Sequence, residues 1–327
     1  MYVMKNIPIN EIKGFRFGHA HNEQALTGCT VVVCEEGAVG GVDVRGGSPG
    51  TRETDVLNPE NMVDKVHGVF LSGGSAFGLD VGSGMMAFLE EQRIGFDVQI
   101  TKVPIVTGAI LFDLYPGDPR TRPDKQMGYT ACENAFKDNA LSKGSVGAGI
   151  GATVGKCAGY EHVMRGGLGT YTIQLGDLQI GAIVAVNAFG DIIDPASNTI
   201  LAGAYDQQLE TFLDSEQKLL NQFKKTNRFS GNTTIGTIVT NAKLTKGQAN
   251  KIAAVAHDGF ARTIHPSHTF VDGDTLFALS TNEVDTDLNQ LAMLAATVVE
   301  QAVLQAVTNA DNLPGIPSSS TILQEKK

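Results

Sequence analysis

Hydrophobic and polar positions along this 327-residue chain predict short strands and longer helices separated by turns. Apolar runs at 29–34 and 66–72, each bounded by turn residues, predict two strands. A polar loop rich in glycine and proline joins them at 45–59. After Ser75, apolar residues fall on one helical stripe and predict a helix over 75–92.

The second half of the chain continues this mixture of strands and helices. Runs at 170–175 and 178–186 are separated by Gly176-Asp177, which is a strong signal for a hairpin. Polar and charged residues at 205–231 predict a mobile, partly helical linker. The other elements we expect are a strand at 233–240, a helix over 246–263 capped by Thr245, a strand at 275–281, a helix over 287–309 and a tail over 312–327. Strand pairs flanked by helices predict an α+β or layered α/β fold.

Composition narrows the class of protein. Hydrophobic residues make up 42% of the chain and charged residues 18%, as in folded globular proteins. The net charge of -10 argues against a nucleic-acid-binding face, which is basic. The N-terminal segment lacks the apolar stretch of a signal peptide, and no apolar run reaches the roughly 18 residues of a membrane span. We therefore expect a cytoplasmic protein with no nucleic-acid or membrane partner.

The cysteines and histidines do not predict a metal site. The four cysteines form no C-x-x-C pair, so we expect reduced, buried thiols. His19 and His21 are close in sequence, as are His265 and His268, but no third ligand stands at a conventional spacing. We expect these histidines to lie in turns or to support other polar groups.

Two glycine-rich motifs lack the context that their chemistry requires. Residues 46–50 match the G-x-S-x-G nucleophile elbow, but no apolar helix follows, so we expect a turn. Residues 151–156 resemble a phosphate-binding loop. That loop needs glycine where Ile150 stands and a hydroxyl residue where Cys157 stands. The sequence therefore does not predict a nucleotide hydrolase.

The segment 230–246 carries the most informative pattern. A polar linker leads directly into a strand whose first residue is Thr233. A threonine hydroxyl is a weak nucleophile, but its own freed α-amine, with a pKa of about 8, is a base placed beside it. The layout suits a nucleophile generated by cleavage of the chain. The same N-T-T sequence is also an ordinary turn exit into a strand.

The chain resembles the family of L-aminopeptidase/D-esterases, β-peptidyl aminopeptidases and nylon-oligomer hydrolases. The resemblance spans nearly all of 15–300. It is carried by ALTGCTVV (25–32), VRGGSPGTRETD (44–55), LSGGSAFGLD (71–80), VGAGIGATVGK (146–156), VNAFGDIID (186–194), GNTTIG (231–236) and VDGDTLFALST (271–281). It implies a four-layer αββα sandwich of the N-terminal nucleophile hydrolase type. A single catalytic domain over 1–327 is then cut between Asn232 and Thr233, giving fragments 1–232 and 233–327.

The resemblance also implies which side chains support Thr233. Asp272 and Asp274 match a pair that is two aspartates in the nylon-oligomer hydrolases, and Ser and Glu in β-peptidyl aminopeptidases. This difference argues against a β-aminopeptidase specificity. Asn187 matches an asparagine that serves the oxyanion, and Lys156 matches a lysine near the nucleophile. An active-site tyrosine of some relatives falls at Phe112. We expect Phe112 and Ser75 to bind the substrate.

The residue types agree with these roles. Two carboxylates at i and i+2 of an extended segment face the same way, and two close carboxylates raise one pKa. The amide of Asn187 can donate to an oxyanion, a contact worth about 3 kcal/mol in acyl transfer. The structural alternatives are a solvated turn for Asp272-Gly273-Asp274, a strand-end cap for Asn187 and a surface lysine for Lys156.

The sequence thus predicts a self-cleaving amide hydrolase or aminopeptidase that needs no metal or organic cofactor. Small peptides, amides or esters are its expected substrates, and a homo-oligomer, a tetramer of αβ units, is the expected assembly. One alternative is an acyltransferase of the ornithine acetyltransferase kind, although its T-M-L-type motif is absent because Thr234-Ile235 follow the nucleophile. The other is a non-enzymatic binding protein of the same fold.

Overall fold

The computed structural model describes residues 4–221 and 231–325 of the chain. Within them the largest sheet has ten strands, in the order β1-β11-β12-β17-β19-β3-β5-β8-β4, with β2 paired to β3. The strands are β1 (Met4–Asn6), β2 (Arg16–Asn22), β3 (Thr27–Val44), β4 (Thr51–Arg52), β5 (Lys65–Ser72), β8 (Val106–Ile110), β11 (Gly167–Leu175), β12 (Leu178–Asn187), β17 (Thr233–Ala242) and β19 (Thr275–Val284).

Strand β3 connects the two halves of this sheet. Its first part pairs with β2 and β5, whereas its second part pairs with β19. The register against β5 shifts between Val33 and Ala38, where Gly37 has a φ of 73°. The strand predicted at 29–34 is therefore only the start of an 18-residue strand. The exposed Glu35 and Glu36 interrupt the apolar run, although the backbone continues in the sheet.

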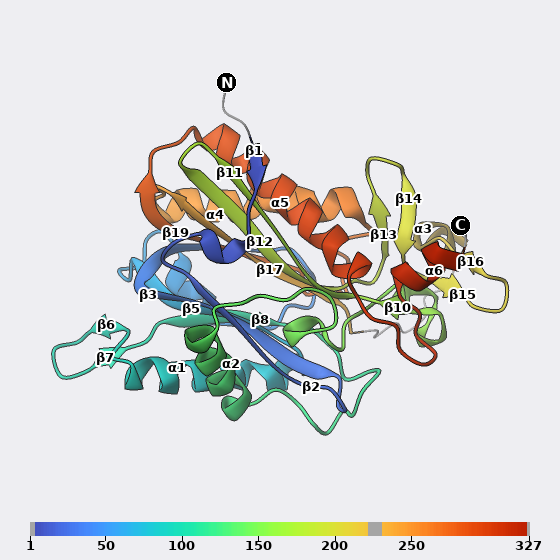
Figure 1. Cartoon of the computed structure of the whole chain (residues 1–327), viewed down its shortest axis with the longest axis horizontal. Coiled ribbons are helices and arrows are strands. Elements are labelled where there is room, and N and C mark those ends of the chain that lie inside the picture. Colours follow the sequence, from blue (N-terminus) through green and yellow to red (C-terminus); the bar gives the residue numbers. More distant parts are fainter. Residues whose placement is uncertain (1–3, 222–230, 326–327) are drawn as a thin grey trace.

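Three hydrophobic cores show that the molecule has four layers (Figure 1). One core lies between a layer of two helices, α4 (Lys246–Thr263) and α5 (Leu288–Thr308), and the half-sheet of β11, β12, β17 and β19. The second core joins the two half-sheets, with Val69 and Leu71 on one side and Ile183 and Val239 on the other. The third lies under α1 (Val81–Glu91) and α2 (Lys125–Lys137). This arrangement confirms the predicted αββα sandwich.

The central strands bring the predicted site residues to one end of the sheet. Strand β11 forms a hairpin with β12 through Gly176-Asp177, as predicted. Strand β12 runs antiparallel to β17 and pairs Asn187 with Thr233. Strand β17 runs parallel to β19 and pairs Ile235 with Thr275. The start of β17 therefore lies beside both the end of β12 and the turn that precedes β19.

Local signals placed most helix ends correctly. Thr245 caps α4 in a capping box with Gln248, as predicted. The helix predicted over 75–92 is instead a 3-10 helix over Ser75–Asp80 followed by α1. Gly74 and Ser75 both have positive φ, which keeps the start of this segment from being α-helical.

The smaller elements surround the main sheet. The short strands are β6 (Phe96–Asp97), β7 (Lys102–Val103), β9 (Thr153–Val154), β10 (Met164–Arg165), β13 (Asp191–Asp194), β14 (Thr199–Ala202), β15 (Tyr205–Asp206), β16 (Thr211–Phe212) and β18 (Ile264–His265). The remaining helices are α3 (Ser215–Asn221) and α6 (Ser319–Glu325), together with 3-10 helices at Ile9–Glu11, Thr54–Leu57, Ser75–Asp80, Gly147–Gly149, Lys156–Ala158 and Tyr160–His162.

Two predictions about irregular segments need correction. The linker predicted over 205–231 is folded over its described part, because β15 pairs with β16 and the buried Ser215 at the start of α3 bonds Asp191. Its helical part is confirmed, and 222–230 lie outside the described residues. The tail predicted over 312–327 is also wrong, since it contains α6 and the buried side chain of Ile322.

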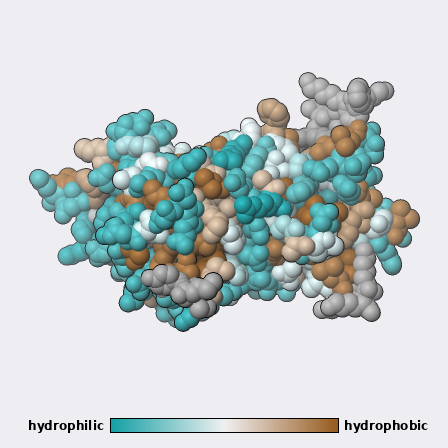
Figure 2. Space-filling view, turned by 90° about the horizontal axis from the view of Figure 1, so that it is seen from above, coloured by the Kyte–Doolittle hydropathy of each residue, from teal (hydrophilic) through white to brown (hydrophobic). Residues whose placement is uncertain are grey.

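Helix α5 is the one described helix that is long and apolar enough to cross a membrane by length and composition. Ten of its residues are buried, and it packs on α4, β11 and β12, so it is a core helix of this sandwich. On the face shown in Figure 2, hydrophilic and hydrophobic residues are interspersed. The four cysteines are free and buried, as predicted.

Candidate active site

Thr233 is the first residue of β17 and is buried. The β-branched residues that follow favour a strand, whereas Gly231, with a φ of 49°, turns the chain just before it. The hydroxyl Oγ1 of Thr233 donates a hydrogen bond to the carbonyl oxygen of Asn232. The predicted nucleophile therefore lies against the peptide bond on its own amino side.

The Asp272-Gly273-Asp274 turn packs directly on this hydroxyl. A Cβ atom added at Gly273 would lie 2.6 Å from Thr233 Oγ1, so only glycine allows the turn to approach so closely. Both aspartates are buried, which excludes the solvated-turn alternative. The structure thus brings the predicted pair to the nucleophile.

Asp274 is hydrogen-bonded to the start of the nucleophile strand. Its Oδ1 accepts the backbone N–H of Thr234 at 2.8 Å. Its Oδ2 accepts the backbone N–H of His268 at 3.0 Å and lies 2.9 Å from Nδ1 of the same residue. Because a carboxylate oxygen is only an acceptor, the imidazole Nδ1 is the donor in this second contact. The expectation that His268 supports another polar group is confirmed.

Asp272 has a different set of contacts. Its Oδ2 accepts the backbone N–H of Thr269 at 3.0 Å and the hydroxyl of the same residue at 2.5 Å. Burial, and then the charge of Asp274, raise the pKa of Asp272 to about 7, while Thr269 and Lys156 act in the opposite direction. One carboxylate of the pair therefore titrates near neutral pH, as expected for close acids.

Lys156 is buried, so the surface-lysine alternative is wrong. Its Nζ donates to the carbonyl oxygen of Thr153 at 2.5 Å, to the carbonyl oxygen of Asn187 at 3.0 Å and to Asn187 Oδ1 at 2.9 Å. Burial lowers the pKa of Lys156 to about 7, and the charges of Asp272 and Asp113 oppose that shift. The amine can therefore gain or lose a proton near neutral pH.

Asn187 ends β12, and its side chain is oriented by contacts at both ends. Its Oδ1 accepts from the Thr153 backbone N–H at 3.0 Å and from Lys156. Its Nδ2 donates to the carbonyl oxygen of Phe112 at 2.8 Å and lies 3.5 Å from the carbonyl oxygen of Gly231. The donor end of this amide therefore points toward the segment that precedes Thr233.

The two predicted substrate-binding residues lie beside this amide. A Cβ atom at Gly231 would come within 2.3 Å of the Phe112 ring, so the ring packs on the chain just ahead of the Asn232 carbonyl. Ser75 is half-buried on the neighbouring turn, and its backbone N–H donates to the carbonyl oxygen of Leu111 at 3.0 Å. Among the described residues its hydroxyl has no hydrogen-bond partner, and its substrate-binding role stays a prediction.

The sequence interpretation missed Asp113. Its Oδ2 accepts the hydroxyl of Thr27 at 2.7 Å, and its Oδ1 accepts the backbone N–H of Gly74 at 2.6 Å. Burial raises the pKa of Asp113 to about 6, while Gly74, Thr27 and finally the charge of Lys156 lower it. The one available signal was a single acidic residue at the end of the apolar run 109–112, three positions after β8 ends.

The glycine-rich loop at 46–50 lies against the Asp272-Gly273-Asp274 turn. It forms bends without a following helix, as predicted. The Ser48 backbone N–H donates to the carbonyl oxygen of Asp272 at 2.7 Å, and a Cβ atom at Gly46 would lie 2.3 Å from the Asp274 nitrogen. The loop thus braces the turn by close backbone contact. Residues 151–156 form β9 and the start of a 3-10 helix, so the phosphate-loop resemblance does not extend to the structure.

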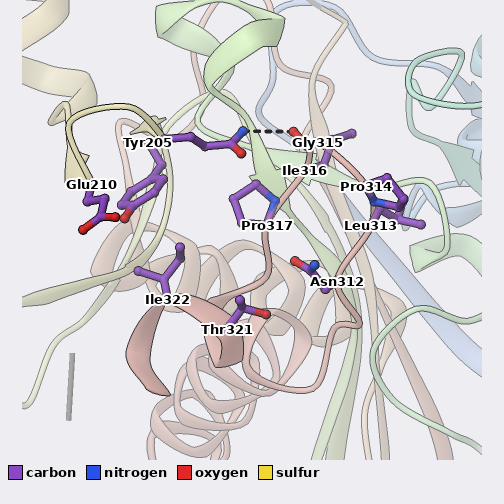
Figure 3. Close-up of a pocket in the computed structure, with 11 residues that line it drawn as sticks. Tyr205, Glu210, Asn312, Leu313, Pro314, Gly315, Ile316, Pro317, Thr321 and Ile322 are labelled. Carbon is purple, nitrogen blue, oxygen red and sulfur yellow. Dashed lines mark hydrogen bonds between the residues drawn. The ribbon is translucent and has the colours of Figure 1, made fainter. Parts of the chain in front are cut away.

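Other features of the described residues lie apart from this constellation. No group of three or more His, Cys, Asp or Glu side chains in 4–221 or 231–325 is placed to hold a metal ion. Figure 3 shows a cavity of about 230 Å³ between the 205–210 segment and the C-terminal loop, and it contains none of the site residues. Its lining is Tyr205, Gln207, Glu210, Asn312, Leu313, Pro314, Gly315, Ile316, Pro317, Thr321 and Ile322.

The fold is that of the N-terminal nucleophile hydrolases, and Thr233, a buried hydroxyl residue, begins one of its central strands. Comparison with solved structures supports this fold. A Burkholderia β-aminopeptidase superposes with a TM-score of 0.72 at 18% identity, covering 97% of this chain and 92% of that one. The L-aminopeptidase D-Ala-esterase/amidase of Ochrobactrum anthropi gives 0.69 at 17% identity, covering 98% and 94%.

Sequence comparison identifies the family. The model of peptidase family S58 matches residues 8–320, and this chain belongs to that family. An uncharacterised aminopeptidase of Mycobacterium leprae is 38% identical, covering 95% of this chain and 92% of its own. A 6-aminohexanoate-oligomer endohydrolase of Agromyces sp. is 32% identical, covering 90% and 84%. The predicted family and the prediction of a self-processing hydrolase acting on amide bonds are confirmed.

Proposed function

We propose that Thr233 acts as the nucleophile twice, first on the chain's own Asn232–Thr233 bond and then on an external amide. The observation that supports this most directly is the contact of Thr233 Oγ1 with the Asn232 carbonyl, packed beneath Gly273. The hydroxyl is already beside the bond that must break. The proximity of reacting groups is a large part of catalysis in acyl transfer.

In the first stage, Thr233 Oγ1 attacks the Asn232 carbonyl carbon, and the hydroxyl proton passes to a nearby base. The C–N bond then breaks, the nitrogen takes up a proton, and the Asn232 acyl group is held as an ester on Oγ1. Water hydrolyses that ester. The products are the carboxyl terminus of fragment 1–232 and the free amine of Thr233 at the start of fragment 233–327.

In the second stage, the free Thr233 amine accepts the Oγ1 proton as the oxygen attacks a substrate carbonyl. The amine then returns a proton to the leaving nitrogen, and an acyl-enzyme ester remains. Water attacks that ester, which releases the acid and restores the hydroxyl. An α-amine has a pKa of about 8, so it exchanges protons readily near neutral pH.

The surrounding side chains suit these steps. Asn187 Nδ2 lies 3.5 Å from the carbonyl oxygen of Gly231 in the attacked segment, and Thr153 and Lys156 fix the orientation of its amide. We assign it to the developing oxyanion. Lys156 supplies a positive charge or a proton beside Asn187, while Asp274 holds the Thr234 backbone N–H and Asp272 balances the charge of Lys156.

The acyl side of a substrate takes the place that Gly231 and Asn232 occupy before cleavage. The Phe112 ring lines that place, and Ser75 lies on the adjoining turn. Peptides and other amides are the substrate class of this family. Within it we propose small peptides, oligoamides and esters. The two-aspartate turn, which matches the nylon-oligomer hydrolases, and the relative named for 6-aminohexanoate oligomers favour linear amides over β-peptides.

The same proposal extends to the association of the two fragments and to the assembly of the protein. Fragments 1–232 and 233–327 stay together as one catalytic domain, because the central strand β17 pairs with β12 on one side and with β19 on the other. We further propose a cytoplasmic homo-oligomer, a tetramer of αβ units. No organic cofactor or metal ion takes part in the steps above.

The substrate proposal is tested by supplying processed protein with three separate substrates. These are an L-amino acid p-nitroanilide, a linear 6-aminohexanoate trimer and a β-peptide of equal length. We expect release of product from the first two and little from the third. An acyl donor with ornithine tests the acetyltransferase alternative, and efficient acetyl transfer with no amide hydrolysis would replace our assignment.

A further inference from the structure

Asp274 receives two of its three hydrogen bonds from one residue, His268. The backbone N–H of His268 lies 3.0 Å from Oδ2, and Nδ1 lies 2.9 Å from the same oxygen. The third bond, from the Thr234 N–H to Oδ1, ties the carboxylate to the residue after the nucleophile. In the described part of the chain, His268 is therefore the only partner of Oδ2.

This double contact requires an unusual backbone at His268. Its φ is 55°, in the left-handed region that is uncommon for residues other than glycine, although histidine, asparagine and aspartate adopt it more often than the rest. The conformation directs the N–H and the ring of one residue to the same carboxylate oxygen. Strained residues of this kind persist where the surrounding structure fixes them, often at functional sites.

The half-buried His268 ring is held on its other side by a buried histidine, His257. The ring centroids of His257 and His268 are 4.8 Å apart and the rings are nearly perpendicular. His257 Nε2 lies 3.1 Å from the carbonyl oxygen of Asp43, whose carboxylate bonds Arg45. Burial lowers the pKa of His257 to about 4, so an uncharged ring supports His268 at neutral pH. The ionisable groups around the pair are thus Asp274, Asp43 and Arg45.

We propose that His268 is a positioning residue that acts through Asp274 to fix the start of β17, and with it the hydroxyl and amine of Thr233. This proposal rests on the function proposed for Thr233. His268 itself touches neither the nucleophile nor the Asn232 carbonyl among the contacts of the described residues. Its role is to hold Oδ2, so that Oδ1 stays on the Thr234 N–H.

Three substitutions separate the ring from the backbone at this position. His268→Asn tolerates a positive φ and keeps a side-chain N–H donor, whereas His268→Gly tolerates the φ and loses the donor. His268→Ala loses both. Processing rate, kcat, KM and melting temperature are measured for each full-length variant. His67→Asn is the control, because His67 also makes a hydrogen bond through Nδ1, where it accepts the Ile105 N–H, although it is buried and His268 is half-buried.

We expect His268→Asn to keep kcat within about threefold of the parent and His268→Gly to lose about 100-fold, as for a small misplacement of a reacting group. KM should change little in both. If His268→Gly is not cleaved at all but keeps the parent melting temperature, and His268→Asn is still cleaved, that result supports the positioning role of His268 as well. His67→Asn should keep the parent kcat.

The proposal is overturned if His268→Gly keeps the parent kcat, or if the Asn and Gly variants are impaired equally. Either result would leave the side-chain donor without a role. A Thr233→Ala variant measured in parallel tests the nucleophile role of Thr233 separately from the positioning role of His268. If that variant is still cleaved and active, the function proposed for Thr233 fails, whatever the result at position 268.

Discussion

Asn187 and Thr233 stand directly opposite each other on the antiparallel strands β12 and β17. This register places an amide, fixed through its oxygen by Thr153 and Lys156, beside the residue that begins the nucleophile strand. The nitrogen of that amide is therefore the end that is left to face the chain before Thr233. The pairing is a property of the sheet, so cleavage of the bond before Thr233 does not remove it.

Replacing Asn187 by Asp should impair catalysis while keeping the oxygen contacts. Aspartate still accepts from Thr153 and Lys156 but lacks the Nδ2 donor that we assign to the oxyanion. We expect kcat for amide hydrolysis to fall between about 10²- and 10³-fold, with KM little changed. Processing should slow as well. Steady-state kinetics on isolated, processed protein measures this effect.

Asn241 provides the control on the neighbouring strand. It lies at the far end of β17, where its side chain bonds the Gln179 N–H and the Asp177 carbonyl oxygen. Asn241→Asp should lower stability and leave kcat near that of the parent. If the two variants lose kcat to the same extent, the special role of Asn187 is refuted.

Asp113 should tune the protonation of Lys156. Its negative charge raises the pKa of Lys156, so removing it in Asp113→Asn must lower that pKa further below about 7. Whichever protonation state the reaction uses, the limb of the pH–kcat profile that reports Lys156 should move to lower pH. A set of kcat values measured from pH 5 to 10 reveals this shift.

Asp191→Asn is the matched control for this experiment. Asp191 is equally buried and accepts the Ala204 and Ser215 backbone N–H groups, but the charge that acts on it is that of Asp214. We expect lower stability and an unmoved pH profile. Equal shifts in the two variants would show that loss of any buried carboxylate produces the effect.

The sequence predicts the local features of this fold well, and its long-range contacts poorly. The Thr245 capping box and the Gly176-Asp177 hairpin depend on residues within a few positions of one another, so a single sequence predicts them. Asp113 is different, because its partners Thr27 and Gly74 lie 86 and 39 positions away. A single sequence carries no sign of such a contact.

Two further features depend on long-range contacts in the same way. The C-terminal segment is rich in serine and looks like a tail, but its backbone bonds the core, as when the Arg165 N–H donates to the carbonyl oxygen of Pro317. Lys156 looks like a surface residue until the fold supplies four carbonyl and amide oxygens around its Nζ. The family resemblance named Lys156 and Asn187, but only the structure shows that they contact each other.

Gly231→Ala should slow cleavage of the chain. The added Cβ would lie 2.3 Å from the Phe112 ring, and the φ of 49° at this position is unfavourable for alanine. The Asn232 carbonyl should then leave its place beside the Thr233 hydroxyl. We expect the half-time of fragment formation to lengthen at least about tenfold, which corresponds to about 1.4 kcal/mol on the barrier.

Gly315→Ala separates the effect of the clash with the Phe112 ring from the effect of the positive φ. Gly315 also has a positive φ, 79°, but a Cβ atom there would meet nothing within 4 Å. Its substitution should leave processing unchanged. Normal cleavage of Gly231→Ala would show that contact with the Phe112 ring does not position the bond.

The central claim concerns one hydroxyl, and a neighbouring threonine supplies its control. Thr234 is also buried in β17, and its own hydroxyl has no hydrogen-bond partner among the described residues. Thr234→Val should therefore be processed and active, as should Thr233→Ser, which keeps a hydroxyl. Thr233→Ala should be neither.

The most direct measurement is the intact mass of the purified parent, Thr233→Ala and Thr234→Val proteins under denaturing conditions. The account predicts two chains that end at Asn232 and begin at Thr233 in the parent and in Thr234→Val, and one uncut chain in Thr233→Ala. An active parent protein that consists only of the uncut 327-residue chain would contradict it.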